Sequence, residues 1–359
     1  MTTNLADDTA FTKPLIKALR GHVDAAAASI ASRQDGPGHH RALEDARPAA
    51  VAWVYMTVLV AWAEDHGLID PWLRAPAEPA RKEFLSLPGM TMTAWVARAF
   101  ASLCVHPGTW CLLDPRYTPV GRKTRPSNKV LEDLAAWWET NAPSLRYEQE
   151  AGPGSLTGWL PGDLLQALSD ERRKALAFCQ TPWWVADFII DLTLVPAAST
   201  FRDITLRTID PCCGTGHFLI RTIDYLWELY TTGSLNARQA EHADPATGWA
   251  PVPPAAAIRR IIDGVHGCER DPLIAATARL RFVVAIGDLM RRSGLLAGPL
   301  RLDRIPQFEP GIVVGDSLLA RVPGFSKDDY AALHPELAAI VNLGYPSERP
   351  TPKDEGKTS

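Results

Sequence analysis

Residues 205–218, TLRTIDPCCGTGHF, constrain the fold more than any other segment of this chain of 359 residues. An apolar run predicts a short strand over residues 205–210, and residues 216–230 have the periodicity of a helix. Gly214 and Gly216 lie in the turn between them, where they let the backbone approach a ligand and adopt angles that a side chain penalises. A strand, a glycine-containing turn and a helix in this order are typical of a ligand site at the carboxyl edge of a parallel sheet.

The turn favours S-adenosylmethionine as the ligand over a dinucleotide. It contains one Gly-x-Gly and lacks the third glycine that a dinucleotide loop carries two residues later. S-adenosylmethionine has no pyrophosphate to seat on a helix N-terminus, so this difference fits its chemistry. Asp210, at the end of the predicted strand, can accept a hydrogen bond from a cationic amino group.

Two further acidic residues follow predicted strands. Residues 264–269 form a second predicted strand that ends in Glu269, and residues 311–315 form a third, directly before Asp316. A carboxylate next to the glycine turn can accept both hydroxyls of a ribose, as in nucleotide-binding α/β folds. Asp316 can accept from an adenine amino group. We therefore expect the three acids to line one pocket.

The remaining pattern divides the chain into a helical part and an alternating part. Residues 10–101 are mostly helical in pattern, with a strongly apolar helix over 49–62, and residues 131–138 predict another helix. Strands and helices alternate after residue 200, which predicts an α/β fold with a Rossmann-like, doubly wound parallel sheet. The predicted divisions are a helical N-terminal domain (1–150), a linker (151–162), a cofactor domain (163–346) and a disordered tail (347–359).

Composition limits the location and the metal content of the protein. The sequence begins with no secretory signal, and no run approaches the roughly 18 uncharged apolar residues that cross a bilayer, so we expect a cytoplasmic protein. The net charge of -4 neither favours nor excludes a nucleic-acid substrate. Cys104, His106 and Cys111 fit no common zinc spacing, and we predict no metal site.

The motifs together resemble a known family. Residues 162–319 are similar to the N6-adenine DNA methyltransferases in which the cofactor motifs precede the catalytic motif, and more narrowly to the PglX methyltransferases of type 2 BREX phage-defence systems. Residues 210–219, DPCCGTGHFL, match the family segment DPxCGSGHFL. Residues 162–166, GDLLQ, resemble its GDLYQ segment, and residues 181–188 resemble its "TP..va.fi" element. The string EDHGLI over residues 64–69 adds a likeness in the helical part.

The resemblance implies a role for each matching position. Asp210 and the loop with Cys212, Gly214 and Gly216 would hold the methionine part of the cofactor. The Thr181-Pro182 element would position the carboxylate, Glu269 would hold the ribose, and Asp316 would contact the adenine. Phe218 and Pro272 would line the pocket or belong to the core, and His217 would serve packing at the junction of loop and helix.

The chain departs from the family at the catalytic motif. The family carries an Asn-Pro-Pro-Tyr tetrad after its fourth strand, where Asn and a proline carbonyl accept from the target amino group and Tyr stacks on the flipped base. The nearest string is NLGY, residues 342–345. In one interpretation Asn342 and Tyr345 are a degenerate tetrad without its prolines. In the other, the segment is an ordinary strand followed by a turn.

The sheet is expected to be incomplete at its C-terminal side. Only 14 residues follow Tyr345, too few for the later strands of the family sheet and for a target-recognition domain. An open apolar sheet edge needs cover, which another chain, a second copy of this one or the helical part can supply. We therefore expect a protein partner or self-association.

Three functions remain open. The first is an adenine-N6 DNA methyltransferase, or the cofactor-binding subunit of a split one, in phage defence or restriction-modification, with DNA as its substrate. The second is a catalytically inactive module that binds S-adenosylmethionine or acts as a scaffold. The third, methylation of RNA, protein or a small molecule, fits the resemblance less well.

Overall fold

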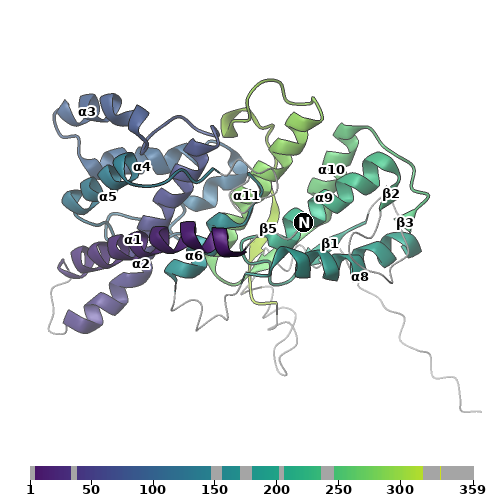
Figure 1. The fold of residues 1–359 in the computed structure, drawn as a ribbon, viewed down its shortest axis with the longest axis horizontal. Coiled ribbons are helices and arrows are strands. Elements are labelled where there is room, and N and C mark those ends of the chain that lie inside the picture. The colour runs from purple at the N-terminus through teal and green to yellow at the C-terminus, as the bar shows by residue number, and fades with distance from the viewer. Residues whose placement is uncertain are drawn as a thin grey trace, which may run out of the picture.

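The computed structural model describes residues 5–33, 39–146, 156–169, 180–201, 206–235, 246–317 and 332. The helical part contains helices α1 to α5 and two 3-10 helices: α1 (Leu5–Ala31), α2 (His39–Asp65), η1 (Ala75–Ala77), α3 (Glu78–Ser86), α4 (Met92–Ser102), η2 (Pro107–Leu112) and α5 (Asn128–Thr140). The second part follows as α6 (Leu160–Leu168), α8 (Trp183–Phe201), β1 (Thr208–Asp210), α9 (His217–Thr232), β2 (Ser234–Leu235), β3 (Ala246–Thr247), α10 (Pro254–Gly264), β4 (Val265–Glu269), α11 (Pro272–Arg292), η3 (Leu302–Arg304) and β5 (Gly311–Val314). Figure 1 shows the two parts side by side, with α11 between them.

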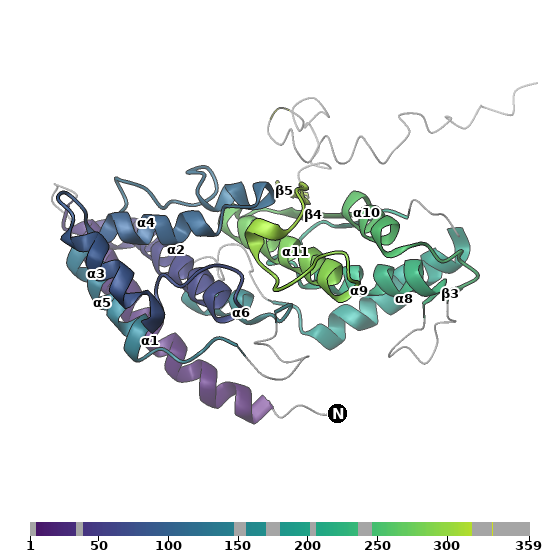
Figure 2. The same ribbon diagram turned by 90° about the horizontal axis from the view of Figure 1, so that it is seen from above.

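Helix α2 is the core of the helical part. Its residues from Ala49 to Ala63 are almost all buried, as expected for a helix that is apolar around its whole circumference. Helix α1 packs along it, and α4, α5 and α6 lie nearby (Figure 2). Inside this packing, the indole nitrogen of Trp138 in α5 donates to the Thr57 hydroxyl at 2.8 Å. The apolar helix predicted over residues 49–62 is therefore confirmed.

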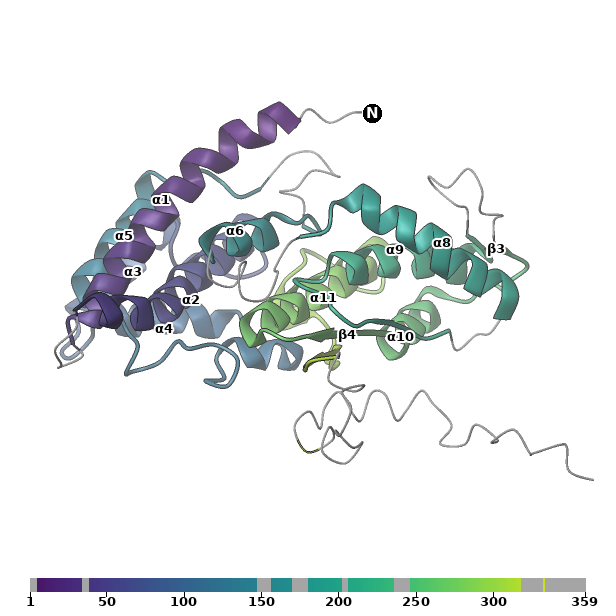
Figure 3. The same cartoon turned by 90° about the horizontal axis from the view of Figure 1, so that it is seen from below.

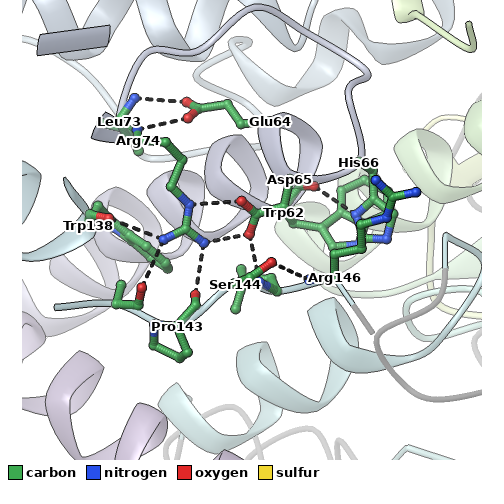
Figure 4. Close-up of polar contacts among 12 residues, drawn as sticks. Trp62, Glu64, Asp65, His66, Leu73, Arg74, Trp138, Pro143, Ser144 and Arg146 are labelled. Carbon is green, nitrogen blue, oxygen red and sulfur yellow. Dashed lines mark hydrogen bonds and ion pairs between the residues drawn. The ribbon is translucent and has the colours of Figure 1, made fainter. Parts of the chain in front are cut away.

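A buried ionic cluster closes the end of α2 (Figure 4). Arg74 forms two hydrogen bonds with the Asp65 carboxylate, at 3.0 and 2.5 Å, and donates to the backbone carbonyls of Trp138, Ala142 and Pro143. The neighbouring carboxylate of Glu64 accepts three backbone N–H groups from residues 72–74, each at 2.9 Å. Burial raises the pKa of Glu64 to about 7, and these N–H groups limit the rise. Glu64 and Asp65 of the EDHGLI string thus hold residues 72–74 against the end of α2.

The sheet is parallel and has the order β1-β4-β5. Asp210 lies in register with Gly267, and Glu269 lies in register with Val314. The helices α9 and α11 follow β1 and β4, as the alternating pattern predicted, and pack against β4. The sequence therefore predicted a parallel sheet correctly, and a separate two-stranded ribbon, β2-β3, lies between α9 and α10.

Helix α11 belongs to both parts of the molecule. Every residue from Leu273 to Met290 is buried. The helix packs against η2 and α6 on one side and against α9, α10 and the sheet on the other. Its Arg279 donates to the backbone of Gly108, Pro310 and Ile312 and is paired with Glu309. One apolar core cluster runs through the helical part and the sheet part.

Some boundaries differ from those predicted. Helix α6 begins at Leu160, inside the segment expected as a linker, because Pro161 suits the first turn of a helix. Helix α6 ends at Leu168. The first strand was predicted from residue 205, and β1 covers Thr208–Asp210. The tail from residue 347 lies outside the described residues.

Helix α8 is unusual because its apolar side faces outward. Asp187 and Asp191 point into the protein, where they contact Arg221 and the Tyr225 hydroxyl of α9. Six large apolar residues of α8 are exposed, with Phe201 at 68% and Trp184 at 55%: Trp183, Trp184, Phe188, Ile189, Leu192 and Phe201. Figure 3 shows α8 along the outer side of α9. We call these six residues the α8 apolar face.

Two segments are long and apolar enough to cross a membrane, which the sequence analysis did not expect. The first, Ala42–Asp65, lies in α2 and is 89% buried, and the second is α8, whose window is 39% buried. A core helix of a soluble protein has the composition of the first segment, and its burial accounts for that apolar character. The exposed side of α8 needs another explanation.

Candidate cofactor site at the carboxyl edge of the sheet

The glycine loop is fastened to the end of β4. The N–H of Cys213 donates to the Cys268 carbonyl at 2.9 Å, and the N–H of Gly214 donates to the Glu269 carboxylate at 3.0 Å. Gly214 and Gly216 have φ angles of 54° and 90°, in the left-handed region that favours glycine. Gly267 lets the loop approach this closely, since a Cβ there would lie 2.9 Å from the Cys213 sulfur. The strand, turn and helix predicted from the sequence thus form one compact unit.

The three acids predicted to share a pocket end three neighbouring strands. Asp210 is the last residue of β1, Glu269 is the last residue of β4, and Asp316 lies two residues after β5. Parallel strands place their carboxyl ends at one edge of the sheet, so the structure brings the three residues to the same edge. The hydroxyl of Ser317 closes the group by donating to the Pro211 carbonyl at 2.9 Å.

Asp210 has an oxygen available for a ligand. One carboxylate oxygen accepts from the N–H of Cys212 at 3.0 Å, and the other has no hydrogen-bond partner among the described residues. Burial raises the pKa of Asp210, and the Cys212 N–H opposes this effect. A buried acceptor without a donor is costly, so a cationic or N–H-bearing ligand group at this oxygen would be favourable.

Glu269 and Asp316 already have protein partners. The two oxygens of Glu269 accept from the N–H groups of Gly214 and Asp271, at 3.0 and 2.8 Å. Burial raises the pKa of Glu269, and the two N–H groups oppose the rise. Asp316 lies 3.6 Å from the guanidinium of Arg270. Each carboxylate oxygen has a second lone pair, so Glu269 can hold the loop and still accept from a ligand hydroxyl.

Thr181 lies beside the junction of the glycine loop and α9. Its carbonyl is 3.2 Å from Nδ1 of His217, the first residue of α9. The preceding residue, Gln180, is fixed by its N–H, which donates to the Gln166 side chain at 2.6 Å. Gln166 ends the GDLLQ segment, so that segment positions the Thr181-Pro182 element. Pro182 itself is exposed and lies directly before α8.

The start of the GDLLQ segment contacts the same loop. Gly162 is buried, and a Cβ at this position would lie 2.3 Å from the Thr215 hydroxyl. That hydroxyl donates to Gln180 at 3.2 Å. Arg281 of α11 donates to both the carbonyl and the hydroxyl of Thr215, at 2.6 and 3.0 Å. The loop is therefore held by three segments besides its own strand.

The other predicted residues have mixed outcomes. Cys212 is exposed in the loop, and Phe218 and Pro272 are partly exposed, with Phe218 packed against the core. Asn342 and Tyr345, the predicted catalytic pair, lie outside the described residues. Cys104, His106 and Cys111 are occupied by other contacts, since both ring nitrogens of His106 contact the backbone of Gly108 and Pro306.

Three residues at the site were not predicted to act there: Gln166, Gln180 and Arg281. Gln166 is the last residue of the GDLLQ segment, which indicated a likeness to the family but no role for this side chain. Arg281 is one of two arginines inside the otherwise apolar middle of α11. A charged residue within a buried run is a signal that sequence reasoning can detect, because such a charge needs polar partners.

His217 should make the stability of the fold sensitive to acid. It is 8% exposed, and burial lowers its pKa to about 3, with the positive charge of Arg281 as a further cause. Between pH 6.5 and 3 the unfolded chain binds a proton that the folded chain does not, so stability falls as the pH falls. Between pH 7 and pH 5 we expect a loss of about 2 kcal/mol from this group.

Urea unfolding of the wild type and of His217→Gln at pH 7 and pH 5 measures this effect. The variant should lose about 2 kcal/mol less than the wild type over this pH interval. Equal losses in both proteins would show that other groups cause the acid sensitivity.

Comparison with known proteins confirms the resemblance seen in the sequence. No family model matches the chain. Over 287 residues, the chain is 31% identical to the adenine-specific methyltransferase PglX of Streptomyces coelicolor. The match covers 75% of this chain and 22% of the relative, so the chain spans less than a quarter of the relative's length.

Solved structures give weaker likenesses. The Type IIL restriction-modification enzyme MmeI in complex with DNA matches 84% of this chain and 40% of its own, with 13% identity and a TM-score of 0.39. A nuclease-deletion mutant of the Type ISP restriction-modification enzyme LlaGI, with a DNA substrate mimic, matches 94% and 22%, with 14% identity and a TM-score of 0.38.

Proposed function

Because the chain is related to the adenine-specific methyltransferase PglX over 75% of its length, we propose that it forms the S-adenosylmethionine-binding part of an adenine-N6 DNA methyltransferase. The setting would be phage defence or restriction-modification in the cytoplasm, with DNA as the substrate. The observation that carries the proposal is the group of Asp210, Glu269 and Asp316 at one sheet edge, beside a glycine loop with positive φ angles. This arrangement supports a class I methyltransferase fold for residues 163–346, after the helical region 1–150 and the linker 151–162.

The residues present fit this cofactor. The unpartnered oxygen of Asp210 suits a cationic amino group, since it is a buried acceptor. The free lone pairs of Glu269 suit the ribose hydroxyls, and Asp316 suits the adenine amino group. Thr181 and Pro182 would hold the carboxylate end, and the exposed Cys212 and partly exposed Phe218 would border the ligand.

The bound cofactor would supply a methyl group on a sulfonium, ready for direct displacement by an amino nitrogen. The protein's part is alignment, because transfer between two held groups gains from proximity and orientation. The glycine loop and the three acids hold the donor. Asn342 and Tyr345 would hold the target adenine, with Asn342 accepting from its amino group and Tyr345 stacking on its ring.

Methyl transfer from labelled S-adenosylmethionine to unmethylated DNA tests the proposal. The assay is run with the chain alone and with the product of the adjacent reading frame added, and N6-methyladenine is identified after digestion of the DNA. Transfer to adenine in either condition supports the proposal. Tight cofactor binding without transfer in both conditions would instead support a module that binds S-adenosylmethionine without catalysis.

That second function has its own support. The string NLGY lacks both prolines of the family tetrad, so it lacks the proline carbonyl that accepts from the target amino group in that family. A scaffold would bind no cofactor at all. Calorimetry with S-adenosylmethionine separates the two, since only the binding module gives a saturable heat that Asp210→Ala removes.

A protein partner belongs to the proposal as well. The α8 apolar face gathers six of the large exposed apolar residues of the described chain on one helix, and Ile209 of the neighbouring β1 is 48% exposed. Within the described residues β1 pairs with β4 alone, so its other side offers N–H and C=O groups to a further strand. Lipid cannot satisfy such backbone groups, and a polypeptide can. The occupant is therefore a polypeptide that adds a strand to β1 and covers α8.

Replacing Phe188 and Leu192 with serine should abolish this association and leave the chain stable. Both side chains are about half exposed, at 47% and 48%, so their loss leaves no cavity. Co-purification with the adjacent gene product, sedimentation of the chain alone and flotation with liposomes measure the association. Ile190→Ser is the matched control, because Ile190 lies on the buried side of the same helix and its loss should destabilise the fold.

The outcomes distinguish the possible occupants. Loss of co-purification in the Phe188→Ser, Leu192→Ser variant supports a polypeptide from another gene. Loss of a dimer in sedimentation would assign the surface to a second copy. Flotation of the wild type with liposomes, abolished in the variant, would contradict a protein occupant.

A further inference from the structure

Helix α11 buries two arginines in different ways. Arg279 and Arg281 are each 3% exposed. Arg279 is paired with the carboxylate of Glu309. Arg281 forms no ion pair with any residue that the structure describes, and its partners are three neutral oxygens: the carbonyl and hydroxyl of Thr215 and the carbonyl of Gly158. Its Nε is buried and has no hydrogen-bond partner in the described part of the chain.

Arg281 nevertheless remains charged. Burial lowers its pKa to about 10, which is still well above neutral pH. The carboxylate of Asp163 favours the charged form from a distance. A buried charge without an ion-pair partner is costly, and strongly perturbed charged groups cluster at functional sites.

That field acts directly beneath the glycine loop. The guanidinium lies 2.6 Å from the carbonyl oxygen of Thr215, the residue between Gly214 and Gly216. Its charge also contributes to the lowered pKa of His217 at the start of α9. The Glu269 carboxylate accepts from the N–H of Gly214, so this loop contacts a buried cation through Thr215 and a carboxylate through Gly214.

Arg281 also fixes the shape of the loop. It joins Thr215 to Gly158, which lies just before α6, and the Thr215 hydroxyl passes the contact on to Gln180. Gln180 precedes Thr181, so one side chain sets both the loop and the segment that faces it. Tyr55 of α2 holds the same region by donating to the Pro161 carbonyl at 3.0 Å.

We infer that Arg281 is a positioning residue that gives the cofactor site its selectivity for a ligand bearing a carboxylate. This inference rests on the proposed function. Acting through Thr215 and Gln180, the guanidinium orients the loop, and its charge, which has no ion-pair partner among the described residues, favours an anionic group on the loop. A cofactor with an amino-acid end supplies such a group, whereas the same cofactor without its carboxylate does not.

Calorimetry with two ligands tests the inference: S-adenosylmethionine and its decarboxylated form, which lacks only the carboxylate. The wild type should bind the first at least 10-fold more tightly than the second. In Arg281→Met this preference should fall below about 3-fold, through weaker binding of the carboxylate-bearing ligand. Arg281→Gln, which keeps a donor to the Thr215 carbonyl and removes the charge, should lose the same preference.

Arg279→Met is the matched control. It removes an equally buried arginine from the same helix and should reduce thermal stability while keeping the wild-type ratio of the two affinities. A purely structural role for Arg281 would weaken both ligands equally, and an unchanged ratio in a folded Arg281→Gln protein would overturn the inference. If neither Arg281 variant folds, Arg281 is a structural residue and the inference fails.

The test separates this inference from the proposed function. A wild type that binds neither ligand contradicts the proposed cofactor site. A wild type that binds both ligands equally keeps the cofactor site and contradicts the role of Arg281 alone.

Discussion

Asp210→Asn is expected to weaken S-adenosylmethionine binding about 10- to 100-fold while leaving the fold intact. The substitution keeps the shape of the side chain and an oxygen that can accept from the Cys212 N–H, at 3.0 Å in the wild type. It removes the charge of the oxygen that has no partner among the described residues. A hydrogen bond to a charged group contributes roughly 1.5–3 kcal/mol, which corresponds to about 10- to 100-fold in affinity. Isothermal titration calorimetry measures the change.

The matched control for Asp210 is Asp263→Asn. Asp263 is a 58% exposed carboxylate in α10, paired with Arg259 on the same helix and outside the proposed site. Its loss should leave the affinity within about twofold, since exposed pairs contribute under about 1 kcal/mol. Binding that survives in Asp210→Asn would remove this residue from the cofactor site and weaken the whole assignment of the loop.

Arg74→Met is expected to lower the free energy of unfolding by about 3–5 kcal/mol, because it leaves the Asp65 carboxylate buried without its partner. The side chains of Arg74 and Asp65 are only 14% and 10% exposed. Three backbone carbonyls would also lose a donor, and the N–H of Leu145 would be the remaining donor to Asp65. Chemical unfolding followed by circular dichroism measures the loss.

Arg47→Met separates the effect of burial from the effect of an ion pair. The Arg47 guanidinium and the Asp24 carboxylate form an ion pair at 2.8 Å, but their side chains are 39% and 62% exposed. Removing this pair should cost under about 1 kcal/mol, since solvent screens it. Similar losses in Arg47→Met and Arg74→Met would contradict the importance of the buried cluster at the end of α2.

Periodicity and strand-terminal acids predicted most of the sheet part. The predicted ends of α9 and β4 lie within two residues of the observed ones, because clear signals such as Gly233 and Pro272 mark where these elements stop. The placement of Asp210, Glu269 and Asp316 at one edge followed from the same pattern. Their roles toward a cofactor stay predictions.

Contacts between distant segments could not be predicted. Nothing local in Gly162 or Gln166 indicates that one packs against Thr215 and the other holds Gln180, since these contacts depend on how α6 meets the loop. The outward apolar side of α8 was also missed, because the helix is apolar nearly all round and its two aspartates gave no sign of facing inward. The catalytic roles of Asn342 and Tyr345 stay predictions, because both residues lie outside the described part of the chain.

The burial of α11 on all sides bears on how such chains can be recombined. Residues near Gly108 in the helical part contact α11 on one side, and the strands that carry the acids contact it on the other. A chimaera that exchanges the helical part between two relatives would therefore replace half of the cavity into which α11 fits. Such a chimaera would also need the matching α11, and α11 in turn packs against the sheet part. We therefore expect that the helical part and the sheet part must be exchanged together.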